Sequence, residues 1–348
     1  NIDTGLDDLI RVYGEKFARD VWFSGKEAID DTEKIIQKEN ISCDYMRSTE
    51  YFFGTTSKGF LGIEKEMKWA KEFGFLVERA DTELSFPNTG VYALRNQAKF
   101  HPLKYLLALR KAAESLGAEF YEHTEAFDIE GERELVITTS GGSINAKHVI
   151  VATYSPFNKP RVTIPKKGGY VSYVYELEIP KDVLPEAMYL DDQNPYHYIR
   201  VDKGEEKDRM VVGGEDHRKE FPIDEERNYA ALFSYVEKTF PKIGFTTASY
   251  WKGDILESVD GLPFIGRYSR KHPNRYVATC FSGNGMTYAM IAGKILRDFV
   301  FSETNQYAYL YDPFRKIKGK ELLVKGRDYL GIMIHGAFRN LFVKKKKD

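Results

Sequence analysis

Three neighbouring segments in the C-terminal part of the chain carry residues suited to bind a ligand: residues 260–266, 274–279 and 281–287. Their composition predicts an extended segment, an apolar strand and a glycine-rich turn that enters a helix. Gly283 and Gly285 allow the backbone to approach a ligand closely, and a helix N-terminus presents N–H groups with partial positive charge. The turn therefore predicts a site for an electron-rich group, although a helix that merely begins after a glycine turn has the same pattern.

The composition argues against several classes of function. Lys and Arg number 51 and Asp and Glu number 52, so the charges nearly cancel and indicate neither a nucleic-acid partner nor an acidic substrate. Cys43 and Cys280 are the only cysteines, which excludes a disulfide framework and any metal motif built on paired cysteines; we expect no metal site. This cysteine content favours a cytoplasmic setting. No signal peptide and no apolar run long enough to span a membrane is visible.

Helical and strand patterns alternate in the first part of the chain, which at 348 residues has room for roughly two domains. Apolar spacing predicts helices over residues 6–36, 62–73 and 102–116. Strands are predicted at residues 50–53, 118–121, 126–129, 135–139, 143–146 and 148–153. The last of these is nearly all apolar, which is typical of a strand buried on both faces.

The pattern changes between residues 169 and 253, where short strands alternate in polarity. These strands are predicted at residues 170–178, 197–202, 209–213 and 246–251, with one helix at 225–240. They favour a mostly antiparallel sheet inserted into an α/β unit, to which a final helix at 286–301 returns. We therefore expect four parts: α/β unit 1–168, inserted sheet 169–253, return to the first unit 254–310, and helical tail 311–348.

The order of these elements resembles the D-amino-acid-oxidase-like family of FAD-dependent oxidoreductases, which includes glycine and sarcosine oxidases. The resemblance is carried by the D-G-L-P-F-I-G run at 260–266, the strand at 274–279 and the turn at 281–287. A second matching stretch covers residues 100–153, and the whole resemblance extends from about residue 6 to about residue 310. It implies a Rossmann-like FAD-binding layer with an inserted substrate sheet that covers the flavin.

The resemblance also implies which residues contact FAD. The turn would direct the positive helix end at the flavin, where it stabilises negative charge on the reduced ring. The backbone near Ala126 would meet the adenine end, and the strand that ends at Ala152 and Thr153 would lie close to the dinucleotide. The complete implied set is Ala126, Ala152, Thr153, Gly261, Ser282, Gly283, Asn284, Gly285, Met286 and Thr287.

The chain departs from the family pattern at both ends. The opening βαβ unit with its G-x-G-x-x-G turn does not occur in this sequence, which begins at Asn1 and not at Met. We therefore expect a fragment of a larger protein, or one completed by residues outside this sequence, with apolar sheet edges exposed. Some relatives with a similar A-T-x-x-P-F run (residues 152–157) carry a C-terminal Rieske iron–sulfur domain, but this chain has no C-x-H pair near its end.

On the substrate side, the family layout implies that polar residues of the inserted sheet face the flavin. The candidates for catalysis are His197, Tyr198, Arg200 and Lys252. Amino-acid oxidases of the family usually place an arginine before the D-G-x-P-x-I-G stretch to bind the substrate carboxylate, and residues 251–259 contain none. Arg200 or Lys252 is the candidate replacement. A surface role for His197 and a strand-face ion pair for Arg200 are the alternatives.

Together these features predict an FAD-dependent oxidoreductase that removes a hydride from the carbon next to an amine nitrogen, giving an imine that hydrolyses. The substrate would be a small amine or amino acid, and the electron acceptor would be oxygen or a partner protein. No general base is required if the amine enters uncharged. The alternative is a non-catalytic binding or assembly module, or a truncated flavoprotein that does not hold FAD.

The final segment, residues 329–348, has apolar residues at helical spacing followed by four lysines at 344–347. Such a helix is typical of a membrane-surface or partner-docking segment. We favour the alternative of a packed terminal helix with a solvated tail.

Overall fold

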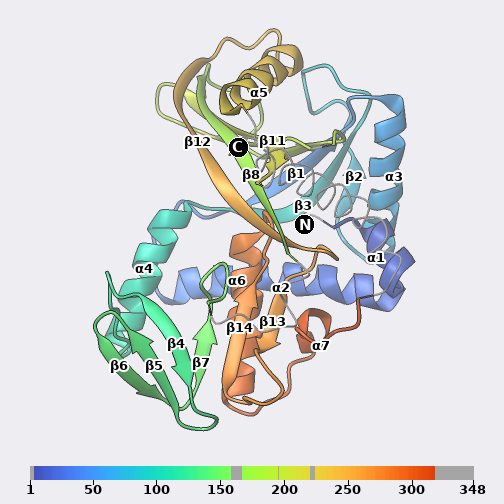
Figure 1. The fold of residues 1–348 in the computed structure, drawn as a ribbon. Coiled ribbons are helices and arrows are strands. Elements are labelled where there is room, and N and C mark those ends of the chain that lie inside the picture. The colour runs from blue at the N-terminus through green and yellow to red at the C-terminus, as the bar shows by residue number, and fades with distance from the viewer. Residues whose placement is uncertain (1–3, 158–166, 195, 220–223, 318–348) are drawn as a thin grey trace, which may run out of the picture.

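The computed structural model describes residues 4–157, 167–194, 196–219 and 224–317, which form two lobes (Figure 1). One lobe is built on an eight-stranded sheet, and the other on a three-stranded sheet packed against helices. Helix α2 (Glu15–Lys38) runs between them. The terminal helix predicted at 329–348, with its lysines, lies outside the described residues.

The large sheet has the strand order β12-β8-β11-β10-β9-β1-β3-β2. Its strands are β1 (Met46–Phe53), β2 (Val77–Arg79), β3 (Val91–Lys99), β8 (Lys167–Ile179), β9 (Met188–Asp191), β10 (Tyr198–Asp202), β11 (Asp208–Arg218) and β12 (Thr246–Ser258). Every neighbouring pair is antiparallel except β1 with β9, which is parallel. Helix α5 (Glu225–Thr239) covers one face, where Leu232 and Val236 are buried in the core. The predicted antiparallel sheet is confirmed.

The large sheet is wider than the predicted insertion. Strands β1, β2 and β3 come from the part expected to belong to the first unit, and they join the sheet where β1 pairs with β9. The predicted boundary at residue 168 therefore does not separate the two lobes. Alternating polarity indicates that a segment is a strand but does not show which distant strand it pairs with.

The second lobe holds strands β13 (Phe264–Arg267), β14 (Arg275–Thr279) and β7 (Val149–Val151) in the order β13-β14-β7. All five residues of β14 are buried, and β14 runs parallel to β7. Helix α6 (Gly285–Val300) packs on α2 and β13, and α7 (Ala308–Tyr311) follows it. A separate antiparallel sheet contains β4 (Ala126–Glu130), β5 (Leu135–Thr139) and β6 (Gly142–Ala146), as predicted.

Helix boundaries differ from the predictions where glycine or a cap decides them. The helix expected over residues 6–36 is divided into α1 (Leu6–Tyr13) and α2 at Gly14, whose φ of 93° favours glycine. Helix α3 (Ser57–Glu72) begins earlier than predicted because the Thr56 side chain accepts a hydrogen bond from the Gly59 N–H.

Helix α4 (Pro102–Ser115) forms as predicted, but its apolar face is largely exposed. Leu103, Leu106 and Leu107 are 59%, 50% and 52% exposed. The strand predicted at 118–121 does not form, since these four exposed residues pair with no strand among the described residues. Ile150 of β7 is also 47% exposed, and β7 is the outer strand of its sheet. This lobe therefore leaves an apolar surface uncovered by the described residues.

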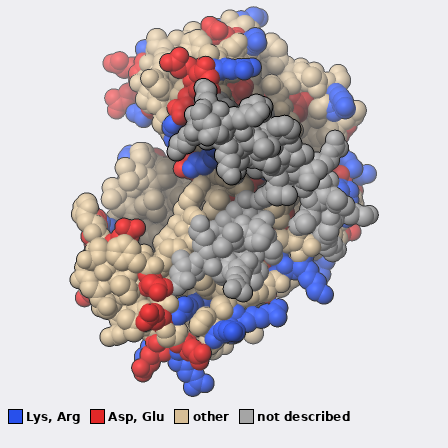
Figure 2. All heavy atoms as spheres, viewed as in Figure 1, with Lys and Arg blue, Asp and Glu red and all other residues tan. Residues whose placement is uncertain are grey.

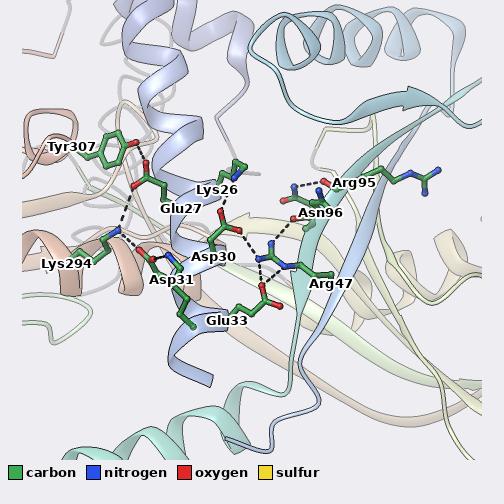
Figure 3. A network of polar contacts seen from close by, with 12 residues as sticks. Lys26, Glu27, Asp30, Asp31, Glu33, Arg47, Arg95, Asn96, Lys294 and Tyr307 are labelled. Carbon is green, nitrogen blue, oxygen red and sulfur yellow. Dashed lines mark hydrogen bonds and ion pairs between the residues drawn. The ribbon is translucent and has the colours of Figure 1, made fainter. Parts of the chain in front are cut away.

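A network of ion pairs holds α2 against both lobes (Figure 3). Asp30 accepts a hydrogen bond from Arg47 of β1 at 2.8 Å, and Glu33 also pairs with Arg47. On the side of the second lobe, Lys294 of α6 pairs with Asp31. Exposed pairs stabilise little individually, but a network that joins three elements restricts their relative positions. Helix α2 is therefore fixed between the sheet and α6.

Charged side chains of both signs occur at the upper and lower ends of the face shown in Figure 2. This distribution agrees with the nearly equal numbers of acidic and basic residues. Within the described ranges, none of the helices combines the length and apolar character needed to cross a membrane.

Candidate functional site

A cavity of about 710 Å³ lies between the lobes. The large sheet forms its floor, and α2 and the turn before α6 (residues 282–287, here the glycine turn) form walls. Its volume is in the range of small-molecule sites. The structure thus brings the predicted ligand-binding turn and the inserted sheet to one space.

The backbone that leads into the glycine turn has an unusual conformation. Cys280 and Ser282 have positive φ values of 63° and 53°, which are uncommon for residues with a side chain. The Ser282 N–H donates to the carbonyl of Leu256, at the end of β12, at 3.2 Å. Strained residues of this kind cluster at ligand sites because surrounding contacts hold them in place. Here β12 holds the turn against the cavity.

The N-terminus of α6 opens onto the cavity. Gly285, Met286 and Thr287 line it, and the preceding Asn284 makes no side-chain cap hydrogen bond. The first turn of α6 contains no acidic residue, and the first N–H groups of any helix have no partner within it. A Cβ added at Gly285 would contact no atom within 4 Å. The geometry suits a planar, electron-rich group that approaches the backbone closely.

Tyr198 of β10, a candidate for the substrate side, also lines the cavity. Its ring lies directly over Gly213 of the neighbouring strand, where an added Cβ would come within 2.0 Å of the Tyr198 Cζ. The Tyr198 hydroxyl makes a 3.1 Å hydrogen bond with Ser172 of β8. Gly213 therefore allows the ring to lie flat across the sheet.

Arg200 lines the cavity two residues further along β10. Its Nε donates to Asp202 at 3.0 Å and its Nη1 donates to the carbonyl of Phe100 at 2.8 Å. The same Asp202 pairs with Lys99 of β3. Burial opposes the charged form of Asp202, but hydrogen bonds from Arg200 and Lys99 lower the pKa of its carboxyl group. Arg200 is thus held by Asp202 and the Phe100 carbonyl, which agrees with the alternative of an ion pair on the strand face. It is also part of the cavity wall.

Two residues that the sequence analysis did not select also line the cavity: Glu50 of β1 and Tyr45, which precedes that strand. Glu50 is 8% exposed. Burial raises the pKa of Tyr45 to about 12, so its hydroxyl stays protonated at neutral pH. The one sequence signal at Glu50 is an ionisable residue directly before the aromatic residues 51–53 of β1.

His197 does not reach this cavity. It lies on the other face of the sheet, in a separate cavity of about 460 Å³, stacked on Tyr235 with ring centroids 3.6 Å apart. Its Nδ1 lies 2.8 Å from a carboxylate oxygen of Asp191, and its backbone N–H donates to the other oxygen at 2.8 Å. Its Nε2 lies 3.3 Å from Glu215. His197 directly precedes β10, and neighbouring residues of extended chain face opposite sides, so His197 and Tyr198 line different cavities.

Lys252 is likewise absent from the cavity wall. Its ammonium group lies 2.5 Å from Glu225 of α5, and its side chain is 47% exposed. The hydrogen bond with Glu225 is the main reason that the pKa of Lys252 is raised. His197 and Lys252 thus lie outside the cavity that Tyr198 and Arg200 line.

The predicted adenine-side residues lie elsewhere in the second lobe. Ala152 and Thr153 are exposed and follow β7 directly, and Ala126 begins β4. The Thr279 hydroxyl, at the end of the parallel strand β14, donates to the carbonyl of Tyr154 at 2.6 Å. The loops after β7 and β14 are thus joined at the carboxyl ends of two parallel strands, the edge where open α/β sheets bind ligands.

Gly261 does not line the cavity either. Its φ is 73°, and an added Cβ would lie 2.1 Å from the Thr4 Oγ1, so glycine is required for conformation and packing. The adjacent Asp260 accepts two 2.8 Å hydrogen bonds from Arg315. Burial opposes ionisation, but Arg315 lowers the pKa of Asp260. Asp260 and Gly261 thus hold in place the backbone that leads into β13, through the Arg315 hydrogen bonds and the packing against Thr4.

Comparison with known proteins is consistent with this arrangement. The family model described as FAD dependent oxidoreductase (DAO) matches residues 12–299. The chain belongs to this FAD dependent oxidoreductase family. FAD is the cofactor of the family, and the resemblance seen in the sequence is confirmed.

The matches to individual relatives cover most of this chain and a smaller share of each relative. It is 29% identical over 319 residues to YhfW of Bacillus subtilis, which is named as a Rieske 2Fe-2S iron-sulfur protein. That match covers 90% of this chain but 62% of YhfW. The gamma-glutamylputrescine oxidoreductase of Escherichia coli is 24% identical, with 87% of this chain and 72% of the relative covered.

The fold of this family member also matches solved structures. Glycine oxidase from Geobacillus kaustophilus superposes with a TM-score of 0.72 at 18% identity, over 87% of this chain and 83% of that protein. At this identity the match supports the fold alone, and it confirms the predicted α/β class with an inserted antiparallel sheet.

The cavity fits the flavin part of FAD. Gly285 leaves space for a planar ring at the cavity, and the N–H groups of the first turn of α6 can stabilise negative charge there. The sequence contains no G-x-G-x-x-G turn, the element that binds the pyrophosphate in dinucleotide-binding folds. The residues that fit FAD in this cavity are thus those suited to the flavin ring.

Proposed function

We propose that this chain forms the flavin and substrate sites of an enzyme that oxidises a small amine or amino acid. The observation that carries the proposal is the 710 Å³ cavity, in which the glycine turn and the polar face of the large sheet line one space. The names of the relatives support the reaction class, since glycine oxidase and gamma-glutamylputrescine oxidoreductase also match this chain.

When bound, FAD supplies the chemistry by accepting a hydride from the carbon next to the amine nitrogen. We assign three roles to the chain. Gly285, Met286 and Thr287 hold the electron-rich edge of the flavin through backbone N–H groups. The sheet floor excludes water and orients the substrate. Arg200 binds an anionic group of the substrate, because its charge lies at the cavity and its side chain is held by Asp202 and Phe100.

Ala126, Ala152 and Thr153 are proposed contacts to the adenine and pyrophosphate part, on the basis of their place at the carboxyl end of β7 and in the adjoining sheet. A cytoplasmic setting and a partner protein as electron acceptor are proposals that rest on the sequence alone.

The test is turnover by protein loaded with FAD. Purified protein is incubated with FAD, desalted, and assayed with an artificial electron acceptor against a panel of primary amines, secondary amines and amino acids. We expect retained flavin and turnover with at least one amine. The non-catalytic alternative predicts that no flavin is retained. Retained flavin without reduction by any amine or amino acid would contradict the proposed reaction.

A further inference from the structure

Trp251 of β12 lies on the cavity wall with its ring uncovered. The residue is 44% exposed, and it makes no hydrogen bond or ring contact with the residues that the structure describes. The neighbouring Tyr250 differs, because it faces α5, where its ring contacts Tyr175 and Tyr229. Tryptophan side chains are highly buried on average, so a half-exposed ring inside a cavity favours a contact with a ligand.

A row of paired residues connects Trp251 with Tyr198 across four strands. Trp251 pairs with Val174 of β8, which pairs with Gly213 of β11. Gly213 pairs in turn with Tyr198 of β10. Residues paired across neighbouring strands point to the same face of a sheet, and all of these except Gly213 line the cavity. The rings at the two ends of the row therefore face one space.

The space between these two rings, here called the aromatic slot, has an apolar floor. The Tyr198 ring extends over Gly213 toward β8, where its hydroxyl meets Ser172 at 3.1 Å. Gly213 and Trp251 lie two strands apart, which is about 10 Å, and Val174 forms the floor between them. Aromatic rings in contact have centroids about 4.5–7 Å apart, so one ring of a ligand fits between the two.

The slot is open toward the glycine turn. Gly253 lies two residues from Trp251 on the same face of β12, and an added Cβ there would meet no other part of the chain within 4 Å. Further along β12, the Leu256 carbonyl accepts the hydrogen bond from Ser282 that holds the turn. Five residues of strand separate Trp251 from this point by about 16 Å. The slot therefore lies beside the proposed flavin position and does not coincide with it.

Arg200 provides an anchor for an anion on the same floor. It follows Tyr198 by two residues, and both side chains line the cavity. Its Nε and Nη1 donate to Asp202 and the Phe100 carbonyl, whereas its Nη2 donates to none of the described residues. Strand geometry places the Cα atoms of Arg200 and Val174 about 12 Å apart. An arginine side chain and an aromatic amino acid together span this distance.

We propose that Trp251 is a specificity-determining residue that stacks on an aromatic group of the substrate. The inference rests on the proposed amine oxidation and makes its substrate more specific. Arg200 binds the anionic group, and the aromatic group enters the slot between Trp251 and Tyr198. The substrate class is therefore an amine that carries both an anionic group and an aromatic ring, such as an aromatic amino acid. A substrate as small as glycine would leave the slot empty.

The first test compares phenylalanine with alanine, which share the amino and carboxylate groups and differ by one phenyl ring. Each is supplied as the racemate to FAD-loaded protein with an artificial electron acceptor. We expect the wild-type kcat/KM to favour phenylalanine by about tenfold or more, because its ring leaves water for the slot. Trp251→Ala should reduce this ratio by about fivefold or more, mainly through KM for phenylalanine, and Trp251→Phe should restore most of it.

Tyr250→Ala is the matched control. Tyr250 is an aromatic residue of the same strand, but it faces α5 and does not line the cavity. We expect this variant to keep the wild-type ratio of phenylalanine to alanine.

Binding of carboxylates that have no amino group separates this inference from the proposed reaction. The affinities of 3-phenylpropanoate and propanoate for FAD-loaded protein are measured by isothermal titration calorimetry. We expect 3-phenylpropanoate to bind about tenfold or more tightly than propanoate. This difference should shrink by about fivefold or more in Trp251→Ala and persist in Tyr250→Ala. Such a result supports the slot even if no amine is oxidised.

Four results would overturn the inference. In the wild-type protein, these are a kcat/KM for alanine equal to or above that for phenylalanine, and equal affinity for the two carboxylates. Either leaves the proposed amine oxidation standing. In Trp251→Ala, an unchanged ratio of phenylalanine to alanine shows that the ring does not contact the substrate. Loss of flavin absorption from folded Trp251→Ala protein assigns the ring to the cofactor instead.

Discussion

The two faces of the extended segment 197–200, which leads into β10, carry polar residues in very different environments. On one face, Tyr198 and Arg200 line the large cavity. On the other face, His197 is 2% exposed and is surrounded by Asp191, Glu215 and the ring of Tyr235. The same short segment thus provides candidate ligand contacts to one side and a closed hydrogen-bonded cluster to the other. A polar residue type alone does not distinguish a functional role from a structural one; its face of the sheet does.

The closed face should respond in stability. His197→Leu leaves the fully buried Asp191 carboxylate without its ring partner, so we expect the free energy of unfolding to fall by about 3 kcal/mol. Urea denaturation measures this change, and exposed His123→Asn should stay within about 0.5 kcal/mol of wild type. Turnover per folded molecule should persist. Loss of turnover at unchanged stability would assign His197 to the reaction and contradict its structural role.

Gly213 tests how the open face is built. Gly213→Ala places a Cβ where the Tyr198 ring lies, so the ring must move away from its position over β11. We expect a loss of about 1–3 kcal/mol in stability together with a higher KM. Denaturation and steady-state kinetics measure the two effects. Gly244→Ala, which has no atom within 4 Å of the added Cβ, should change neither; an unchanged KM in Gly213→Ala would remove Tyr198 from the substrate site.

Arg200→Ala should act mainly on substrate binding. For a substrate that carries an anionic group we expect KM to rise by about tenfold or more, because a hydrogen bond to a charged group is lost. Arg209→Ala is the matched control, since Arg209 lies on the next strand and its side chain is 67% exposed. If both variants show the same KM, Arg200 has only the strand-face role.

The smallest effect is expected for Lys252→Ala. Its ion pair with Glu225 is half exposed, so we expect the free energy of unfolding to fall by less than about 1 kcal/mol and KM to stay unchanged. Thermal unfolding and kinetics with an anionic substrate measure both. A rise in KM comparable to that of Arg200→Ala would show that Lys252 contributes to substrate binding.

Much of the fold could be predicted from the sequence because it depends on local pattern. The helix that begins at Gly285, the buried strand β14 and the alternating strands β8, β10 and β11 all follow from periodicity and glycine placement. The pairing of β1 with β9 could not be predicted, because alternation is the same whichever distant strand is the partner.

The candidate site was predictable to the extent that the glycine turn, Tyr198 and Arg200 meet at one cavity. Strand alternation, applied to β10, would already have placed His197 on the opposite face. Glu50 was missed because it lies in a segment with no other sign of function, and only its pairing brings it to the cavity floor. Gly261 was selected as part of the D-G-L-P-F-I-G run. The structural role of this run depends on hydrogen bonds between Asp260 and Arg315, which lie 55 positions apart in the sequence.

The most direct test of the central claim is flavin retention by a matched pair of glycine variants on α6. At both Gly285 and Gly293 an added Cβ would meet no atom of another element within 4 Å, but only Gly285 lines the cavity, so Gly285→Val and Gly293→Val form the pair. Each protein is loaded with FAD and desalted, and its visible flavin absorption and melting temperature are compared with wild type. We predict that both variants fold, that Gly293→Val keeps its flavin and that Gly285→Val loses it. A folded Gly285→Val protein with wild-type flavin content would contradict the assignment of this cavity to the cofactor.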